Sequence, residues 1–316
     1  MKRLGIDDSL PCGQKSIVTV GNFDGVHKGH ATLFNEVVKR SVANGACSVA
    51  ITFEPNTKSV VYPELSPMLI TTLDEKEILI ESFGLDYLMV IPFDEDFRQL
   101  SPQEFVSNIL VGKLRATGWV MGEGHSVGKD RRGGKNFLPE VVDKYHINMF
   151  TANLCTQDET VISSTKIRKL IVEGRITQAV DILGHPYLIC VQRISGTKTG
   201  TKLGYPTINF RKPSSQKVIP PAGVYAAELE IRGVRIQGAL YYGDCPTFTD
   251  RNIHFEFHAL SFQGDEPRLD EWCRIWLHKF IRKDEPFGSE EVLRERIAQD
   301  IEDIKSFFYR REKTWY

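Results

Sequence analysis

The sequence predicts an α/β domain with a doubly wound parallel sheet, followed by an antiparallel β-barrel domain with a C-terminal helix. Two patterns support this fold class. Apolar runs alternate with helical patterns in the first half of the chain, whereas short runs of period two follow one another in the second half. The 316 residues are enough for two domains, each with its own core.

In the first half, buried-strand patterns alternate with amphipathic helix patterns. Glycines close two of the helices, Gly45 and Gly84, as helix C-caps often do. Because ligands of doubly wound sheets bind at the carboxyl ends of the strands, we expect the turn after the first strand to face a ligand. The predicted strands are 16–20, 47–53, 87–92 and 119–122, and the predicted helices are 31–45, 75–83 and 101–110.

That turn, residues 21–30 (GNFDGVHKGH), is the most informative stretch of the chain. It joins a predicted strand to a predicted helix, whose N-terminus offers unpaired N–H groups and partial positive charge, both suited to phosphate. His27 and His30 are three residues apart, so both can lie on one side of the first turn and donate to phosphate oxygens. The alternative is an ordinary strand-to-helix turn with two surface histidines.

A second phosphate pattern occurs at residues 162–168 (ISSTKIR). Ser163, Ser164 or Thr165 can cap the helix that continues to Gly174, and Lys166 and Arg168 add positive charge near its start. By itself the pattern favours a plain helix cap over a ligand site. Beside the histidine turn, it favours a second group of phosphate ligands.

The second half predicts a compact barrel of short strands. Its helical periodicity returns only at 289–308. Glycines at Gly196, Gly200 and Gly204 in the segment GTKTGTKLGYPTIN could let backbone wrap a phosphate, although the segment is no Walker A loop and also fits a mobile hairpin. The predicted strands are 187–191, 205–210, 224–231, 234–240, 253–262 and 274–280.

Residues 254–258 (HFEFH) predict a strand with one polar and one apolar face. His254, Glu256 and His258 share one face, and Phe255 and Phe257 share the other. Two histidines and a carboxylate at this spacing suit a metal site, and they also suit a polar barrel face.

Composition sets the remaining bounds. Forty basic and 41 acidic residues give a net charge of −1, which favours neither a nucleic-acid nor a membrane partner. The six cysteines form no CxxC pair, as is typical of thiols in a reducing compartment. The N-terminus lacks the apolar core of a signal peptide, and no apolar run approaches the roughly 18 residues of a membrane span. We therefore expect a cytoplasmic protein.

The decapeptide GNFDGVHKGH resembles the HxGH signature of nucleotidyltransferases and, in its full form, the FMN adenylyltransferase module of bacterial bifunctional riboflavin kinase/FAD synthetases. The resemblance implies that His27 and His30 bind the ATP phosphates and stabilise the transition state. It also implies that Gly21, Asn22, Phe23 and Asp24 lie beside the nucleotide and its magnesium, and that Ser164, Thr165 and Arg168 of the family's ISSTxIR pattern bind ATP phosphates.

The segment around Gly196, Gly200 and Gly204 resembles the GxxxGxxxGxPTxN segment of riboflavin kinases. The resemblance implies that these glycines bind nucleotide, and that Thr207 and Asn209 coordinate the magnesium of MgATP. It further implies that Glu256 is the general base for the substrate hydroxyl. Arg282 matches a flavin-side landmark of the family.

Two segments depart from the family pattern. The usual TFxPHP is TFEPNT at residues 52–57, and the usual GxDFxFGxxRxG loop is GEGHSVGKDRRG at residues 122–133. The flavin-binding positions implied for that loop are Gly124, His125, Val127 and Arg131. FMN adenylylation is therefore expected to be the more altered of the two activities.

The resemblance covers nearly the whole chain and predicts a bifunctional enzyme. Residues 1–184 would adenylylate FMN to FAD, and residues 185–316 would phosphorylate riboflavin to FMN. ATP is the expected co-substrate, Mg²⁺ the expected cofactor, and riboflavin, FMN and ATP the small-molecule partners, with no nucleic acid or membrane. The sequence does not predict an oligomeric state.

Three alternatives remain at this point. One is a riboflavin kinase with a weak or inactive adenylyltransferase module, and another is a flavin-binding regulator without turnover. A relative of class I aminoacyl-tRNA synthetases would share the histidine turn, but the chain has no KMSKS-like loop.

Overall fold

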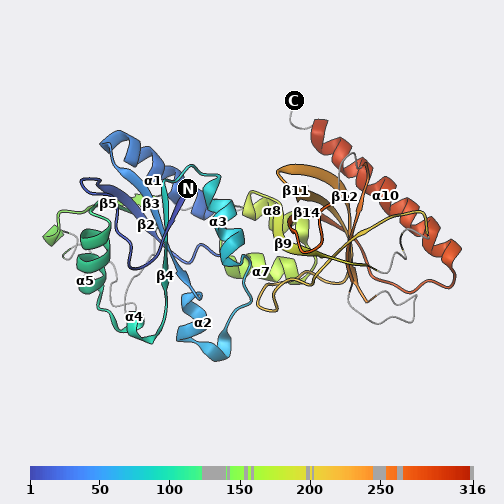
Figure 1. The fold of residues 1–316 in the computed structure, drawn as a ribbon, viewed down its shortest axis with the longest axis horizontal. Coiled ribbons are helices and arrows are strands. Elements are labelled where there is room, and N and C mark those ends of the chain that lie inside the picture. The colour runs from blue at the N-terminus through green and yellow to red at the C-terminus, as the bar shows by residue number, and fades with distance from the viewer. Residues whose placement is uncertain are drawn as a thin grey trace. The chain divides into compact units, whose positions relative to one another are not determined.

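The structure is a computed structural model, and it divides the chain into two compact units, residues 1–164 and 165–316 (Figure 1). It describes residues 1–122, 140, 143–152, 156–157, 160–196, 200, 203–244, 254–261 and 266–313. Within these ranges, none of the helices is both long and apolar enough to span a bilayer.

The first unit is built on a six-stranded parallel sheet of order β1-β4-β3-β2-β5-β6. The chain passes from β2 to β3 on one side, while β5 pairs with β2 on the other side, so the order reverses at β2. The predicted doubly wound sheet is confirmed, and residues 21–30 follow the strand at its switch point. The strands are β1 Lys2–Leu4, β2 Ser16–Val20, β3 Cys47–Glu54, β4 Tyr87–Pro92, β5 Ala116–Gly122 and β6 Asn148–Ala152, with a separate pair β7 Thr156–Gln157 and β8 Thr160–Val161.

The helices of the first unit begin and end where local capping chemistry is strongest. Gly45 closes α1 in the left-handed conformation, as predicted, and Thr72 starts α3 with a reciprocal capping box to Glu75. Ser101 caps α5 in the same way, but from Phe105 the predicted helix is wound as a π-helix, η2. The bounds are α1 Lys28–Asn44, α2 Thr57–Val61, η1 Pro63–Leu65, α3 Leu73–Glu81, α4 Glu95–Gln99, α5 Pro102–Glu104 and η2 Phe105–Lys113.

The second unit is a closed barrel of antiparallel strands in the order β10-β13-β12-β11-β14-β9, which confirms the predicted barrel. Two helices precede it, and α8 packs on β14 and β9. The bounds are α7 Ser164–Val172, α8 Ile176–Leu183, β9 Tyr187–Ile194, β10 Ile208–Phe210, β11 Gly223–Ile231, β12 Val234–Gly243, β13 His254–Ala259, β14 Trp272–Lys283 and α10 Glu290–Lys313.

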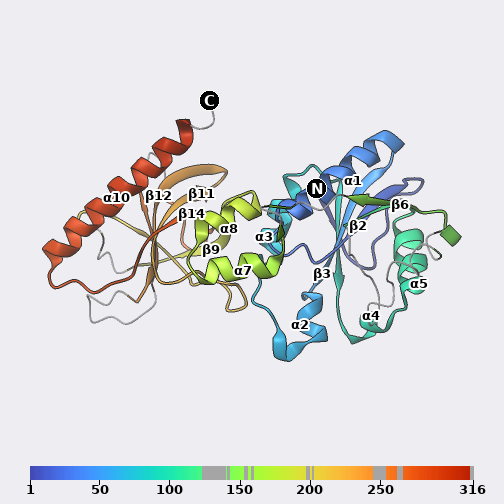
Figure 2. The same ribbon diagram turned by 180° about the vertical axis from the view of Figure 1, so that it is seen from behind.

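Helix α10 covers the outside of the barrel, as both ribbon views show (Figures 1 and 2). Ile304 and Phe308 of the helix pack on Val224 and Ala226 of β11. The predicted C-terminal helix is thus present, and it protects one face of the barrel from water.

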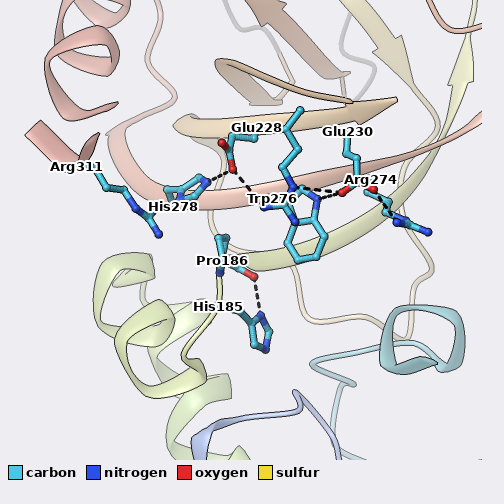
Figure 3. Close-up of polar contacts among 9 residues, drawn as sticks. His185, Pro186, Glu228, Glu230, Arg274, Trp276, His278 and Arg311 are labelled. Atoms are coloured by element: carbon cyan, nitrogen blue, oxygen red, sulfur yellow. Dashed lines mark hydrogen bonds and ion pairs between the residues drawn. The ribbon is translucent and has the colours of Figure 1, made fainter. Parts of the chain in front are cut away.

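A buried polar cluster lies at the end of this interface. His278 of β14 is 4 % exposed, and its Nε2 is 2.9 Å from Oε2 of Glu228, while Nδ1 faces the guanidinium of Arg311 on α10 (Figure 3). A neutral imidazole that donates from Nε2 and accepts at Nδ1 satisfies both partners. Burial, together with the charges of Arg311 and Arg235, lowers the pKa of His278 despite the opposing carboxylate of Glu228.

Candidate active sites

The turn between β2 and α1 brings the two predicted histidines together. His27 is the N-cap of α1, and its carbonyl accepts hydrogen bonds from the backbone N–H groups of His30 (2.7 Å) and Ala31 (3.0 Å). The imidazole rings of His27 and His30 stack, with centroids 3.6 Å apart and planes inclined by 17°. Two nitrogen-bearing rings therefore lie side by side at a helix N-terminus, an arrangement suited to an anion.

The backbone of this turn is held in an unusual conformation. Phe23 and Val26 have φ values of 48° and 43°, in the left-handed region, which is rare for a β-branched residue such as valine. Both side chains are 1 % exposed, and the Phe23 ring meets the His30 ring edge-on at 5.3 Å. Such backbone costs about 1–3 kcal/mol per residue. Burial of the two apolar side chains opposes this cost and keeps the turn in place.

Asp24 contacts the loop before α3. Its Oδ1 accepts hydrogen bonds from the backbone N–H groups of Ile70 (2.9 Å) and Thr71 (3.0 Å) and lies 3.4 Å from the Thr71 hydroxyl. The Asp24 side chain is 4 % exposed. The carboxylate thus ties the histidine turn to a second segment of the unit.

Asn22 is held by the segment that follows β3. Its Nδ2 donates to the hydroxyl of Thr57 (2.8 Å), and its Oδ1 accepts from the backbone N–H of Thr57 (3.1 Å). The Thr52 hydroxyl donates to the backbone carbonyl of Asn22 (3.3 Å). Gly21 lies at the same point, where its N–H donates to the carbonyl of Ile51 (3.0 Å).

A buried lysine supports this segment from α3. The Nζ of Lys76 donates to the Thr52 hydroxyl (3.2 Å), and the side chain is almost fully buried. Burial lowers the pKa of Lys76, against the opposing charges of Asp24, Glu54 and Glu77. The lysine thus lies next to the segment that holds the histidine turn.

The second phosphate pattern reaches the turn through its serine. The hydroxyl of Ser164 donates to the backbone carbonyl of Asp24 (3.0 Å). Ser164 is the last residue of the first unit and the first residue of α7, whereas Thr165 and Arg168 belong to the second unit. The structure therefore joins Ser164 directly to the histidine turn.

In the barrel, the predicted base and the predicted magnesium ligand are in contact. The hydroxyl of Thr207 donates to Oε2 of Glu256 (2.8 Å). Asn209, two residues further on in β10, is the direct cross-strand partner of Glu256 in β13. Thr207, Asn209 and Glu256 thus form one group of oxygen-bearing side chains on neighbouring strands.

Two of the predicted glycines pass close to this group. A Cβ at Gly196 would lie 2.2 Å from the amide nitrogen of Asn209, and a Cβ at Gly200 would lie 2.4 Å from the carbonyl of Tyr205 and 3.1 Å from the Thr207 side chain. Only glycine permits such an approach of backbone to side chain. The third glycine, Gly204, adopts a left-handed turn with φ of 90°.

The predicted faces of β13 are confirmed where burial is described. Phe255 and Phe257 are at most 2 % exposed, whereas Glu256 and His258 are half-buried. His258 Nδ1 lies 2.9 Å from the carbonyl of Pro206. Within the described part of the chain, no three histidine, cysteine, aspartate or glutamate residues form a metal-binding group.

Arg282 is engaged with the C-terminal helix. Its Nε lies 3.0 and 2.9 Å from the two carboxylate oxygens of Asp300, which is 4 % exposed. Burial raises the pKa of Asp300, and the guanidinium of Arg282 opposes that effect. This pair fixes α10 to the last strand of the barrel.

The other predicted flavin-side positions, Gly124, His125, Val127 and Arg131, lie outside the described residues. Three side chains that hold the histidine turn were missed from the sequence, namely Thr57, Thr71 and Lys76. The sequence contained one indication for Thr57, because residues 52–57 (TFEPNT) depart from the usual pattern. It contained none for Thr71 and Lys76, which look like ordinary residues near a helix start.

Comparisons with known proteins match both halves of the chain. A model of the FAD synthetase family matches residues 10–166, and a model of the riboflavin kinase family matches residues 183–308. A curated protein of Buchnera aphidicola from Schizaphis graminum, named bifunctional riboflavin kinase/FMN adenylyltransferase, is 34 % identical over 96 % of this chain and 97 % of its own. Proteins of the same name from Listeria monocytogenes (94 % of this chain and 93 % of its own) and Escherichia coli K12 (92 % of each) are 31 % and 29 % identical.

A solved structure shares this fold over nearly its whole length. It is titled a macrolide-efflux protein from Streptococcus pneumoniae and gives a TM-score of 0.83 at 25 % identity, covering 96 % of this chain and 99 % of that one.

Proposed function

This chain belongs to the family of bifunctional riboflavin kinase/FMN adenylyltransferases, and we propose that it carries out both reactions on one polypeptide. It phosphorylates riboflavin to FMN with ATP, and it transfers AMP from ATP to FMN to give FAD and pyrophosphate. One observation supports this proposal most directly: each unit holds its own group of side chains suited to phosphate transfer. The first has the stacked histidine pair, and the second has the Thr207–Glu256 contact.

We assign adenylylation to residues 1–184 and phosphorylation to residues 185–316. The family matches at 10–166 and 183–308 support this division. The compact unit of the barrel begins earlier, at residue 165, because α8 packs on barrel strands. The proposed boundary between the activities therefore lies after α8, whereas the compact unit of the barrel includes α8 and all of α7 except Ser164.

In adenylyl transfer, a phosphate oxygen of FMN attacks the α-phosphorus of ATP, and the bond from that phosphorus to the bridging oxygen breaks. Pyrophosphate leaves with the electron pair. His27 and His30 donate hydrogen bonds to the phosphate oxygens, on which negative charge grows in the transition state. Their stacking at the N-terminus of α1 holds both donors in place before ATP binds. Gly21, Asn22, Phe23 and Asp24 form the turn that carries them, and we assign Ser164, Thr165 and Arg168 to the remaining phosphate oxygens. Ser164 would bind through its backbone N–H at the start of α7, because its hydroxyl donates to the carbonyl of Asp24.

In the kinase reaction, Glu256 accepts the proton of a riboflavin hydroxyl as its oxygen attacks the γ-phosphorus of ATP, and ADP leaves. The 2.8 Å hydrogen bond turns the Thr207 hydroxyl hydrogen toward Glu256, so the lone pairs of Thr207 point elsewhere. Oxygen donors of this kind suit Mg²⁺, and Thr207 and Asn209 would hold it. Magnesium would neutralise charge on the ATP phosphates, which Gly196, Gly200 and Gly204 approach with backbone.

On the flavin side we assign Gly124, His125, Val127 and Arg131 to FMN in the first module. Arg282 is assigned to the flavin of the kinase module, where its bond to Asp300 would fix the guanidinium. We also propose a cytoplasmic location. Three cysteines of the described residues, Cys12, Cys47 and Cys273, are free thiols, which supports a reducing compartment.

A crossed pair of variants tests the function. Wild type with riboflavin and MgATP is expected to yield FMN and then FAD, separated by chromatography. Glu256→Gln should lose FMN formation but still convert added FMN to FAD, and His30→Ala should do the reverse. Each variant thus shows that the other module is folded. FMN without FAD in the wild type would instead support a kinase with an inactive second module, and absence of turnover would support a regulator.

A further inference from the structure

Asn22 of the histidine turn makes two hydrogen bonds with a threonine outside the turn. The side chain of Asn22 both donates to the hydroxyl of Thr57 (2.8 Å) and accepts from its backbone N–H (3.1 Å). Thr57 is the first residue of α2, which lies directly after β3 (Figure 1). The preceding residue, Asn56, caps that helix by accepting from the backbone N–H of Lys58. Asn22 is therefore anchored to a capped helix start.

The two hydrogen bonds to Thr57 set the orientation of the Asn22 amide as well as its position. An amide side chain can rotate by half a turn and exchange its oxygen with its nitrogen, but the backbone N–H of Thr57 can only donate and therefore requires Oδ1. The Thr57 hydroxyl then accepts from Nδ2. The amide plane of Asn22 is therefore fixed, and so is the direction of its remaining N–H and lone pair. The backbone of Asn22 is fixed as well, because its carbonyl accepts from Thr52 (3.3 Å), which Lys76 contacts in turn.

We propose that Thr57 is a positioning residue of the adenylyl-transfer site, which acts by orienting the Asn22 amide toward the phosphates of MgATP. This inference rests on the proposed function of the first module. Asn22 lies five residues before His27 in the same turn, and its hydrogen bonds with Thr57 involve neither histidine of the pair. Thr57 itself touches no reacting atom in this account.

The structure supplies a graded series of variants. Thr57→Ser keeps both hydrogen bonds, Thr57→Val keeps only the backbone bond, and Thr57→Pro removes both. Proline is well tolerated at the first position of a helix, where its missing N–H has no partner within the helix. Asn56, with φ of −55° and ψ of 132°, already has the extended conformation required before proline. The proline variant therefore removes the contact with little strain in α2.

The loss of both hydrogen bonds should lower kcat/KM for MgATP in FAD formation by about 5- to 150-fold. Thr57→Val should lie between Thr57→Pro and wild type, and Thr57→Ser should restore wild-type values. Ser59→Ala is the matched control: Ser59 lies in the same helix, and its hydroxyl donates to the carbonyl of Asn56 (2.6 Å) rather than to Asn22. Riboflavin phosphorylation should be unchanged in every variant.

A double-mutant cycle separates positioning of Asn22 from a merely structural contact. In an Asn22→Ala background, Thr57→Pro should have no further effect on kcat/KM, because its target is already gone. An equal loss in both backgrounds would overturn the proposal, as would a Thr57→Pro variant that is as active as wild type. If wild type forms no FAD from FMN and MgATP, the proposed function itself has failed and the inference fails with it. If wild type forms FAD and Thr57→Pro matches it, only the role of Thr57 is refuted.

Discussion

Replacing Glu256 with glutamine should remove kinase chemistry while leaving the barrel intact. Glutamine has nearly the same shape, and its amide oxygen can still accept the hydrogen bond that the Thr207 hydroxyl donates over 2.8 Å. The pairing of residue 256 with Asn209 and Tyr241 involves only backbone groups, so the register of β13 is unaffected. What is lost is the ability of the side chain to accept a proton.

The expected size of the effect follows from that loss. A positioned general base contributes about 10²–10⁴-fold to rate. Each tenfold step corresponds to about 1.4 kcal/mol, so the activation barrier should rise by about 3–5.5 kcal/mol. Because Glu256 is half-buried and pairs with Thr207, nucleotide binding should change much less than kcat.

The assay is the initial rate of FMN formation from riboflavin at saturating MgATP, followed by chromatography. A conversion of added FMN to FAD at the wild-type rate by the same preparation shows that the chain is folded. Thr207→Val leaves the carboxylate in place but removes both its hydrogen-bond donor and a proposed magnesium ligand, so it should lower kcat as well. A kcat for Glu256→Gln within tenfold of wild type would refute the base assignment.

Three further outcomes are expected. His30→Ala should slow FAD formation by about 10²–10³-fold, the usual cost of one preorganised donor, and unchanged FAD kinetics would show that the stacked pair is structural. A fragment of residues 165–316 should keep kinase activity. A fragment of residues 185–316 should unfold at a lower denaturant concentration because it lacks α8, whose buried side chains Ile182 and Leu183 each contribute about 1.5–3 kcal/mol. Equal unfolding midpoints for the two fragments would contradict this. Burial lowers the pKa of His278 in the folded chain, so the unfolded chain binds its proton first as the pH drops (Figure 3). The free energy of unfolding should therefore fall below about pH 6.5. Denaturant titrations at pH 7.5 and 5.5 should show a smaller fall for His278→Gln than for wild type. The same slope in both proteins would be evidence against a neutral, buried imidazole.

The sequence by itself determined the features that depend on neighbouring residues. The run SIVTV is β2 to the residue, Gly45 closes α1, and Ser101 starts a helix, because strand runs and helix caps are set by side chains a few positions apart. The same holds for the order of the two folds, which follows from the change between alternating strands and helices and successive short strands, and for the histidine turn, which lies between a strand pattern and a helix pattern. The short strands β1 and β6 have no such local signal, and their pairing with the sheet edges defines them.

Only the tertiary structure decided which distant side chains meet. Thr57 contacts Asn22 from 35 residues away, Thr207 contacts Glu256 from 49 residues away, and Arg282 reaches Asp300 across the interface with α10. Asp24 is predicted beside the nucleotide, and one of its carboxylate oxygens accepts a hydrogen bond from the backbone N–H of Ile70. Such contacts follow from strand register and from barrel closure, and neither is encoded in a local pattern. The chemistry of each site could therefore be predicted from its motif, while the residues that hold the motif in position required the fold.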